Sequence, residues 1–153
     1  MKSFVEDYLE RLENLVTDLC EAVQGLPQEA MDWKPGPDMK AIGVLLAHTA
    51  GSLRYWIGDI ALGEPSGRVR ASEFQAHGIP GQVLQQRLRE ILAYARAGLP
   101  RFQSADLALP GASTAEGEVV TRNWALLHAL EHASLHLGHI QLTAQLWKQR
   151  TGS

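Results

Sequence analysis

The chain has 153 residues, of which 45% are hydrophobic and 20% are charged, and its formal net charge is -3. This length suits one domain with one hydrophobic core, spanning residues 1–153. With 14 Lys and Arg against 17 Asp and Glu and no basic run, the composition argues against a nucleic-acid partner. No stretch reaches the roughly 18 apolar residues of a membrane-spanning helix, and the opening MKSFVEDYLE lacks the apolar core of a signal peptide. We therefore expect a soluble, cytoplasmic protein with no membrane partner.

Four segments have the apolar periodicity of amphipathic helices. Their expected ranges are 4–23, 39–61, 81–97 and 122–149. Glycines such as Gly25, Gly63 and Gly98 follow the first three segments, each with a proline close behind, and would end a helix there. The sequence therefore predicts a helical protein with no large sheet.

The connections between these segments are rich in Pro and Gly. Residues 67–81 are expected to form a polar connection with one helical turn near residues 71–75. Residues 104–120 are too broken by Pro and Gly for a helix, and are long enough to cross from one end of a bundle towards the other. Without a strand pattern or an internal repeat, the fold class is all-α, a four-helix bundle with a long connection between helices three and four.

Cysteine chemistry is limited to a single residue, Cys20. One cysteine cannot form an internal disulfide or a cysteine-based zinc site, so we interpret Cys20 as a small buried residue in a protein of a reducing compartment. Any metal ion must therefore be held by histidine or carboxylate.

Four of the six histidines lie on the last predicted helix, at His128, His132, His136 and His139. At about 100° per residue they share one face of that helix, within about a quarter of its circumference. Two histidines at i and i+4 are spaced to converge on one metal ion. The residues between them supply no general base, so the helical metalloprotease motif does not apply.

A fifth histidine, His48, is expected on the inner face of the second helix. A lone histidine on an apolar face is more often a core residue than a ligand, but a histidine pair with a further inward histidine raises the prospect of a metal site. Ligation and a structural role stay open at this point. The sixth, His77, lies in the polar connection and is interpreted as a surface residue.

Two stretches resemble a known family. IGVLLAHTAGSLRYWIGD, preceded by LPQEAMDWKPGP, and LLHALEHASLHLGHIQLTAQLW are similar to the DinB-like (DinB/YfiT-type) metal-binding four-helix bundle proteins, over about residues 26–147. In that family a histidine of helix two and an H-x-x-x-H pair of the last helix, followed after one residue by glycine, bind a divalent metal. The resemblance therefore implies the ligands His48, His132 and His136, with Gly138 as the glycine.

The chain departs from the family pattern at two places. His139 stands where many members have glutamine, and Lys40 and Ala41 stand where many have an Asn-Ser pair. Neither departure removes a ligand. His128 and His139, which lie outside the motif, and Glu131 are candidates for hydrogen bonding to the ligand imidazoles.

Three neutral imidazoles leave a divalent ion with open coordination positions, as in catalytic sites. Zinc and nickel both suit these ligands, and the sequence does not distinguish them. The open position would lower the pKa of a bound water or bind a thiol as its thiolate. The resemblance implies the second use, because the family includes metal-dependent S-transferases and isomerases that use bacillithiol, mycothiol or glutathione.

We therefore expect a metal-dependent thiol S-transferase-like enzyme whose partners are a small-molecule thiol and a small electrophile. The alternatives are a metal-dependent hydrolase and a non-catalytic metal-binding stress-response bundle. The metal's open position is expected to face a pocket walled by helices two and four and by residues 104–120. Arg54 is a candidate for binding an anionic group, and Trp56 is interpreted as a core residue. The catalytic residues, and the choice between monomer and homodimer, stay open.

Overall fold

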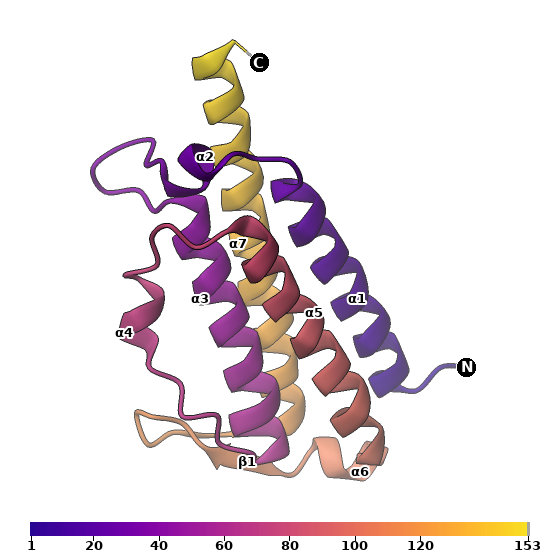
Figure 1. The fold of residues 1–153 in the computed structure, drawn as a ribbon. Coiled ribbons are helices and arrows are strands. Elements are labelled where there is room, and N and C mark those ends of the chain that lie inside the picture. Colours follow the sequence, from indigo (N-terminus) through magenta and orange to yellow (C-terminus); the bar gives the residue numbers. More distant parts are fainter. Residues whose placement is uncertain (153) are drawn as a thin grey trace.

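The computed structural model describes residues 1–152, except for the side chain of Thr151. Four long helices pack side by side, and shorter elements lie at the ends and along one side of this bundle (Figure 1). The elements are α1 Phe4–Val23, α2 Gln28–Asp32, α3 Ile42–Arg54, the π-helical η1 Tyr55–Leu62, α4 Arg70–Glu73, α5 Gly81–Gly98, the 3-10 helix η2 Leu99–Arg101, α6 Ser104–Leu107, β1 Pro110–Ser113, β2 Val119–Thr121 and α7 Arg122–Thr151. The four predicted helices and the helical bundle are thus confirmed.

The first helix illustrates why these segments fold as predicted. The Ser3 hydroxyl accepts a hydrogen bond from the backbone N–H of Glu6, and the Glu6 carboxylate accepts one from the backbone N–H of Ser3. This capping box satisfies two N–H groups that a helix start would leave unpaired. The apolar stripe behind it, with Leu12 and Leu19 fully buried, packs against α5 and α7.

The second predicted helix differs at both ends. It begins at Ile42 instead of residue 39, because residues 33–41 form turns around Pro35 and Pro37. After Arg54 the chain continues in the wider π-helical form as η1, a form that often occurs next to functional sites. Gly63 then ends the helix in the left-handed conformation, with φ of 72°, which glycine adopts without strain.

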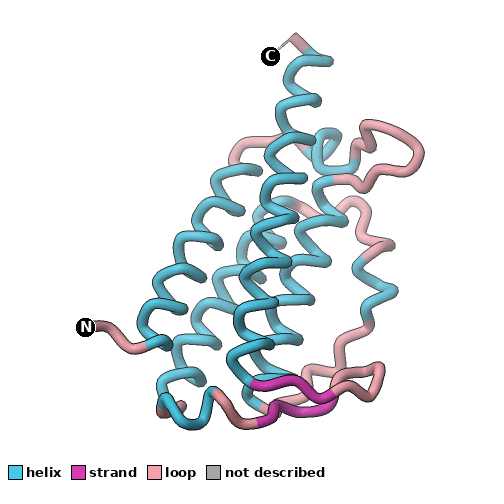
Figure 2. Tube along the Cα trace, turned by 180° about the vertical axis from the view of Figure 1, so that it is seen from behind, coloured by secondary structure: helices cyan, strands magenta, loops and turns pink. Residues whose placement is uncertain are grey.

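The helix directions reveal which connection crosses the bundle. Figure 1 shows α1 and α7 running one way and α3 and α5 running the other way. Because α3 and α5 are parallel, the chain that connects η1 to α5 must return along the length of the bundle. Residues 63–80, which include α4, make this return. The expectation that residues 104–120 cross the bundle is therefore wrong. Those residues stay at one end, where they form α6 and the antiparallel hairpin of β1 and β2 (Figure 2).

Two connections lie against α3 and η1: the hairpin loop, and residues 63–80, which we call the crossing segment. The hairpin loop is attached there, since the backbone N–H of Ala115 donates to the Tyr55 hydroxyl at 2.9 Å. The crossing segment passes the middle of α3, where α4 packs against it. No helix within the described residues combines the length and hydrophobicity that crossing a membrane requires.

Candidate metal centre

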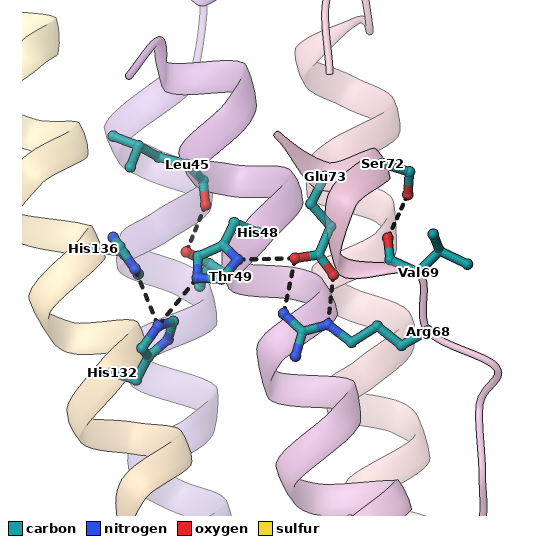
Figure 3. Close-up of polar contacts among 9 residues, drawn as sticks. All are labelled: Leu45, His48, Thr49, Arg68, Val69, Ser72, Glu73, His132 and His136. Atoms are coloured by element: carbon teal, nitrogen blue, oxygen red, sulfur yellow. Dashed lines mark hydrogen bonds and ion pairs between the residues drawn. The ribbon is translucent and has the colours of Figure 1, made fainter. Parts of the chain in front are cut away.

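Three of the predicted histidines meet between α3 and α7. The Nε2 atom of His132 lies 3.2 Å from Nε2 of His48 and 3.2 Å from Nε2 of His136 (Figure 3). One ligand atom from each of the three lies within 4.8 Å of the others, a grouping that can hold a metal ion. We call these three residues the histidine cluster. The i, i+4 spacing on α7 and the inward position on α3 thus bring together the side chains that the sequence singled out.

The spacing and chemistry of the histidine cluster fit a metal ion. Metal–nitrogen bonds of about 2.0–2.1 Å place two ligand nitrogens roughly 3.0–3.4 Å apart, depending on the angle between the bonds. The observed separations of 3.2 Å fall in this range. Lone pairs of three imidazole nitrogens that are directed at one point repel each other. A cation bound at that point attracts all three lone pairs and so removes the repulsion. Divalent zinc or nickel suits such nitrogen ligands.

The surroundings keep the cluster neutral and thus able to donate lone pairs. Burial, reinforced by the neighbouring histidines, lowers the pKa of His132 to about 4 and that of His136 to about 4. Burial also lowers the pKa of His48, although its hydrogen bond with Glu73 opposes the shift. At neutral pH all three rings are therefore uncharged, which is the form that binds a metal.

These shifts predict the pH dependence of the metal-free protein. Its free energy of unfolding is expected to fall as the pH is lowered from about 6.5 to about 4, because unfolded imidazoles take up protons near 6.5 whereas the folded His132 and His136 stay neutral until about 4. Urea unfolding of chelator-treated protein at several pH values measures the slope. The His132→Gln, His136→Gln double variant should have a shallower slope. An equal slope in both proteins would contradict the prediction.

A buried carboxylate holds the α3 histidine in place. Nδ1 of His48 lies 2.9 Å from Oε2 of Glu73, which α4 carries to the side of α3. Arg68 donates two hydrogen bonds to the same carboxylate, at 2.6 and 2.8 Å (Figure 3). Burial acts to raise the pKa of Glu73, but the hydrogen bonds from Arg68 and His48 lower it below its usual value. An ionised Glu73 makes His48 donate from Nδ1, which leaves the Nε2 lone pair facing the cluster.

Sequence reasoning missed Glu73 and Arg68. Their one signal was the expected helical turn near residues 71–75, which contains a glutamate in a polar connection. The carboxylate of Glu73 can lie this close to α3 because residue 51 is glycine: a side chain on Gly51 would overlap that carboxylate. Glycine at this helical position therefore permits the close approach of α4, even though glycine weakens a helix relative to alanine.

The Glu73 contact predicts a loss of metal affinity on substitution. Glu73→Gln keeps the size of the side chain but removes the charge that orients His48 and pairs with Arg68, so metal affinity should fall about 10- to 100-fold. Competition with a chromophoric chelator measures it. Glu131→Gln is the matched control, because the Glu131 side chain on α7 is 82% exposed. Equal affinities for the two variants would refute a positioning role for Glu73.

Two residues of the cluster, His48 and His132, line a pocket of about 640 Å³, which we call the histidine pocket. It is lined by His48, Ser52, Tyr55, Trp56, Asp59, Pro65, Gly67, Arg68, Arg70, Ala115, Glu116, His128 and His132. The expected walls, the second and fourth helices and the long connection, all contribute. The crossing segment, through residues 65–70, forms a further wall that the sequence did not predict.

The remaining predicted residues lie around the cluster. His128 lines the histidine pocket, and its ring stacks on Trp124 at 4.9 Å between centroids. Glu131 faces His128, with its carboxylate 3.6 Å from Nδ1, instead of a cluster imidazole. His139 is exposed, with its ring centroid 5.6 Å from that of His136. The interpretations of His77 as a surface residue and of Cys20 as a buried one are confirmed.

Arg54 is placed differently from the expectation. It pairs with Asp59 at 3.0 Å, donates to the backbone carbonyl of Glu64 and stacks on the ring of Tyr94. These contacts turn it into a separate cavity of about 510 Å³ between α3 and α5. Arg54 is therefore outside the histidine pocket, and Arg70, which lines it, is the exposed guanidinium near the cluster. Trp56 is half-buried: it packs against the core, as expected, and it also lines the histidine pocket.

Comparison with known proteins identifies the family of this chain. The model of the DinB superfamily matches residues 10–140. The chain belongs to the DinB superfamily. No curated protein matches it significantly. Among solved structures, a conserved protein of Enterococcus faecalis is 17% identical, with a TM-score of 0.72 over 95% of this chain and 98% of that one.

Two further structures share the fold of this DinB protein. YfiT from Bacillus subtilis, described as a probable metal-dependent hydrolase with an unusual four-helix bundle topology, is 16% identical, with a TM-score of 0.68 over 99% of this chain and 91% of that chain. A mycothiol-dependent maleylpyruvate isomerase is 14% identical, with a TM-score of 0.64 over 90% of this chain and 62% of the isomerase. At these identities the likeness establishes the fold alone.

Proposed function

We propose that this DinB protein is a divalent-metal-dependent enzyme that transfers a small thiol to a small electrophile. The observation that carries the proposal is the convergence of three Nε2 atoms, of which those of His48 and His132 belong to residues that line the histidine pocket. Three protein ligands leave coordination positions for a substrate, unlike the four ligands of a structural zinc site. The pocket, at about 640 Å³, has the size of a small-molecule site.

The histidine cluster would hold the ion, and Glu73 would orient one of its rings. A divalent ion bound there supplies Lewis acidity, which lowers the pKa of a thiol or a water at the open position. Zinc and nickel are the metals that we propose. Because the rings are neutral at pH 7, the cluster is ready to bind either metal without first losing protons.

The other residues of the histidine pocket suit the transfer step. His128 lies in the pocket outside the cluster, with its ring centroid 5.9 Å from that of His132, and in this proposal its ring would accept the thiol proton. The sulfur then forms a bond to an electrophilic carbon, while the bond from that carbon to its leaving group breaks and the leaving group departs with the electron pair. Tyr55 and Trp56 supply aromatic surface against which the electrophile can pack.

The mycothiol-dependent isomerase supports the thiol as cosubstrate, through a shared fold. The description of YfiT favours a second candidate, a metal-dependent hydrolase in which water takes the place of the thiol. The two candidates use the same ligands and the same pocket. They differ in whether a thiol is consumed.

The deciding experiment is a transfer assay with protein shown to be fully metal-loaded. Monochlorobimane serves as the electrophile, and bacillithiol, mycothiol, glutathione and cysteine are tested in turn. We expect a metal-dependent rate above the uncatalysed background with at least one thiol, and a large loss of that rate in His128→Ala. Absence of such a rate with all four thiols would refute the transferase. Metal-dependent cleavage of an activated ester without any thiol would favour the hydrolase.

A further inference from the structure

The cavity of about 510 Å³ that Arg54 lines takes no part in the proposed transfer step. It lies between α3, α5 and the crossing segment, and we call it the α3–α5 cavity. Its volume is typical of small-molecule sites. The two helices leave this space because α3 presents small residues to it: Ala47, Ala50 and Gly51. The α3–α5 cavity is therefore large enough for a ligand of its own.

The α3–α5 cavity has an apolar end and a polar end. The crossing segment runs antiparallel to α3 and α5, so its last residues lie beside the beginning of both helices and its first residues lie beside their ends. Lining residues from the beginning of α3 and the end of the crossing segment are apolar: Ala47, Ala76 and Ile79. Polar lining residues come from the ends of α3 and α5 and from the beginning of the crossing segment: Arg54, Tyr94, Ser66 and Arg68. A matching ligand is thus apolar at one end and polar at the other.

Arg54 is held in a fixed orientation at the polar end. Its guanidinium carbon lies 4.3 Å from the centroid of the Tyr94 ring, and its Nη1 donates to Asp59 at 3.0 Å. A Cβ on Gly58 would overlap Nη1, so glycine at this position lets the guanidinium lie against the helix. The described residues accept three hydrogen bonds from Arg54, whereas a guanidinium has five N–H groups. Two N–H groups therefore remain for a ligand.

Arg68 supplies further donors at the same end. Two of its five N–H groups donate to Glu73 (Figure 3), and the described residues accept none of the other three. Arg87 and Glu90 of α5 also line the cavity, but both are exposed and their charges are opposite. The polar end thus offers N–H donors of two guanidinium groups, which favour an anion. A carboxylate matches the planar guanidinium group in shape and charge.

We propose that the α3–α5 cavity binds a small carboxylate with an unbranched apolar chain. The carboxylate accepts hydrogen bonds from Arg54 and Arg68, and the chain lies against the apolar end. Ala47 and Arg54 are seven residues apart on α3, which is roughly 10 Å along the helix axis. An extended medium-chain carboxylate such as octanoate has a similar length. Arg54 thus binds an anionic group, as the sequence suggested, but outside the histidine pocket.

The pair of Glu73 and Arg68 separates this site from the histidine cluster. Glu73 lines the α3–α5 cavity, whereas His48, which its Oε2 contacts at 2.9 Å, lines the histidine pocket. A carboxylate bound at Arg54 is therefore not a metal ligand, and its binding requires no metal ion. The proposal is for this reason independent of the proposed transferase activity.

Isothermal titration calorimetry of the full chain, treated with chelator to remove metal, tests the proposal with octanoate as the probe. Removal of the metal keeps carboxylate binding to an ion out of the measurement. We expect one octanoate per chain, bound about tenfold or more tightly than octan-1-ol, which has the same chain but no charge. Equal affinities for the two compounds, or no saturable binding of octanoate, would overturn the proposal.

Arg54→Met tests the polar end, because it removes the guanidinium and keeps an unbranched side chain. The affinity for octanoate should fall about tenfold or more, while the affinity for octan-1-ol should hold. Arg89→Met is the matched control, since Arg89 lies on α5 outside the cavity. Circular dichroism verifies that the loss of the Asp59 contact leaves the helices intact.

Ala76→Leu tests the apolar end without changing the contacts of Arg54. The larger side chain occupies space in the cavity, so it should weaken the binding of octanoate and of octan-1-ol alike, by about tenfold. Ala71→Leu, the same change at an exposed residue of α4 that does not line the cavity, should leave both affinities unchanged. Octanoate binding that neither Ala76→Leu nor Arg54→Met weakens would place the ligand elsewhere and overturn the proposal.

Discussion

Replacing His132 and His136 together by alanine is expected to abolish metal binding, from about one ion per chain to a background level. Each residue contributes one of the three converging Nε2 atoms, so the double variant keeps His48 alone. A single imidazole cannot hold a zinc or nickel ion against dilution. Elemental analysis of protein purified without chelator, alongside circular dichroism to verify that the helices remain, measures the result.

Two neighbouring histidines provide the matched control. His128→Ala and His139→Ala remove imidazoles from the same helix but from outside the cluster, and both variants should keep the full metal content. If either is as necessary as His132, the ligand set within this face of α7 is wrong. Full metal content in the His132, His136 double variant would remove the site altogether.

The helices and the histidine cluster are local in origin, which explains why the sequence predicts them. Apolar spacing of three and four residues depends only on the helical repeat, and so does the convergence of His132 with His136. His48 required one further step, namely that the inner faces of two bundle helices meet. The same reasoning places His128 on the cluster side of α7, where the structure has it lining the pocket.

The crossing segment is the part that the sequence does not specify. Residues 63–80 and residues 99–121 are both long and both rich in Gly and Pro, so length alone cannot tell which one spans the bundle. The choice depends on whether α3 lies parallel to α5, a property of the packed helices. Glu73 and Arg68 were missed for this reason, since their contact with His48 exists only once the chain returns past α3.

Fold and site are linked through Gly51 and Glu73. Parallel packing of α3 and α5 makes the chain return along α3, and this return brings a buried carboxylate to the rear of His48. The absence of a side chain at Gly51 lets that carboxylate come close. The bundle topology thus supplies the hydrogen-bond acceptor that fixes one ligand, and the same segment forms a wall of the histidine pocket.

Removing the metal is expected to lower the free energy of unfolding by about 4 kcal/mol when the free metal had been present at a thousandfold excess over its dissociation constant. The cluster joins α3 to α7, helices far apart in the chain, so an ion bound there stabilises the folded state alone. For a domain of this size the change corresponds to a fall of roughly 10 °C in melting temperature. Thermal unfolding at pH 7, with metal and then with excess chelator, measures the difference.

The same measurement on the His132→Ala, His136→Ala variant decides whether the effect comes from this site. That variant lacks two of the converging nitrogens, so chelator should leave its melting temperature unchanged. A chelator-induced fall of equal size in both proteins would place the stabilising ion elsewhere. An unchanged midpoint in the unmodified, metal-loaded protein would mean that the cluster binds metal too weakly to contribute to folding, because any ion that binds only the folded chain must raise its stability.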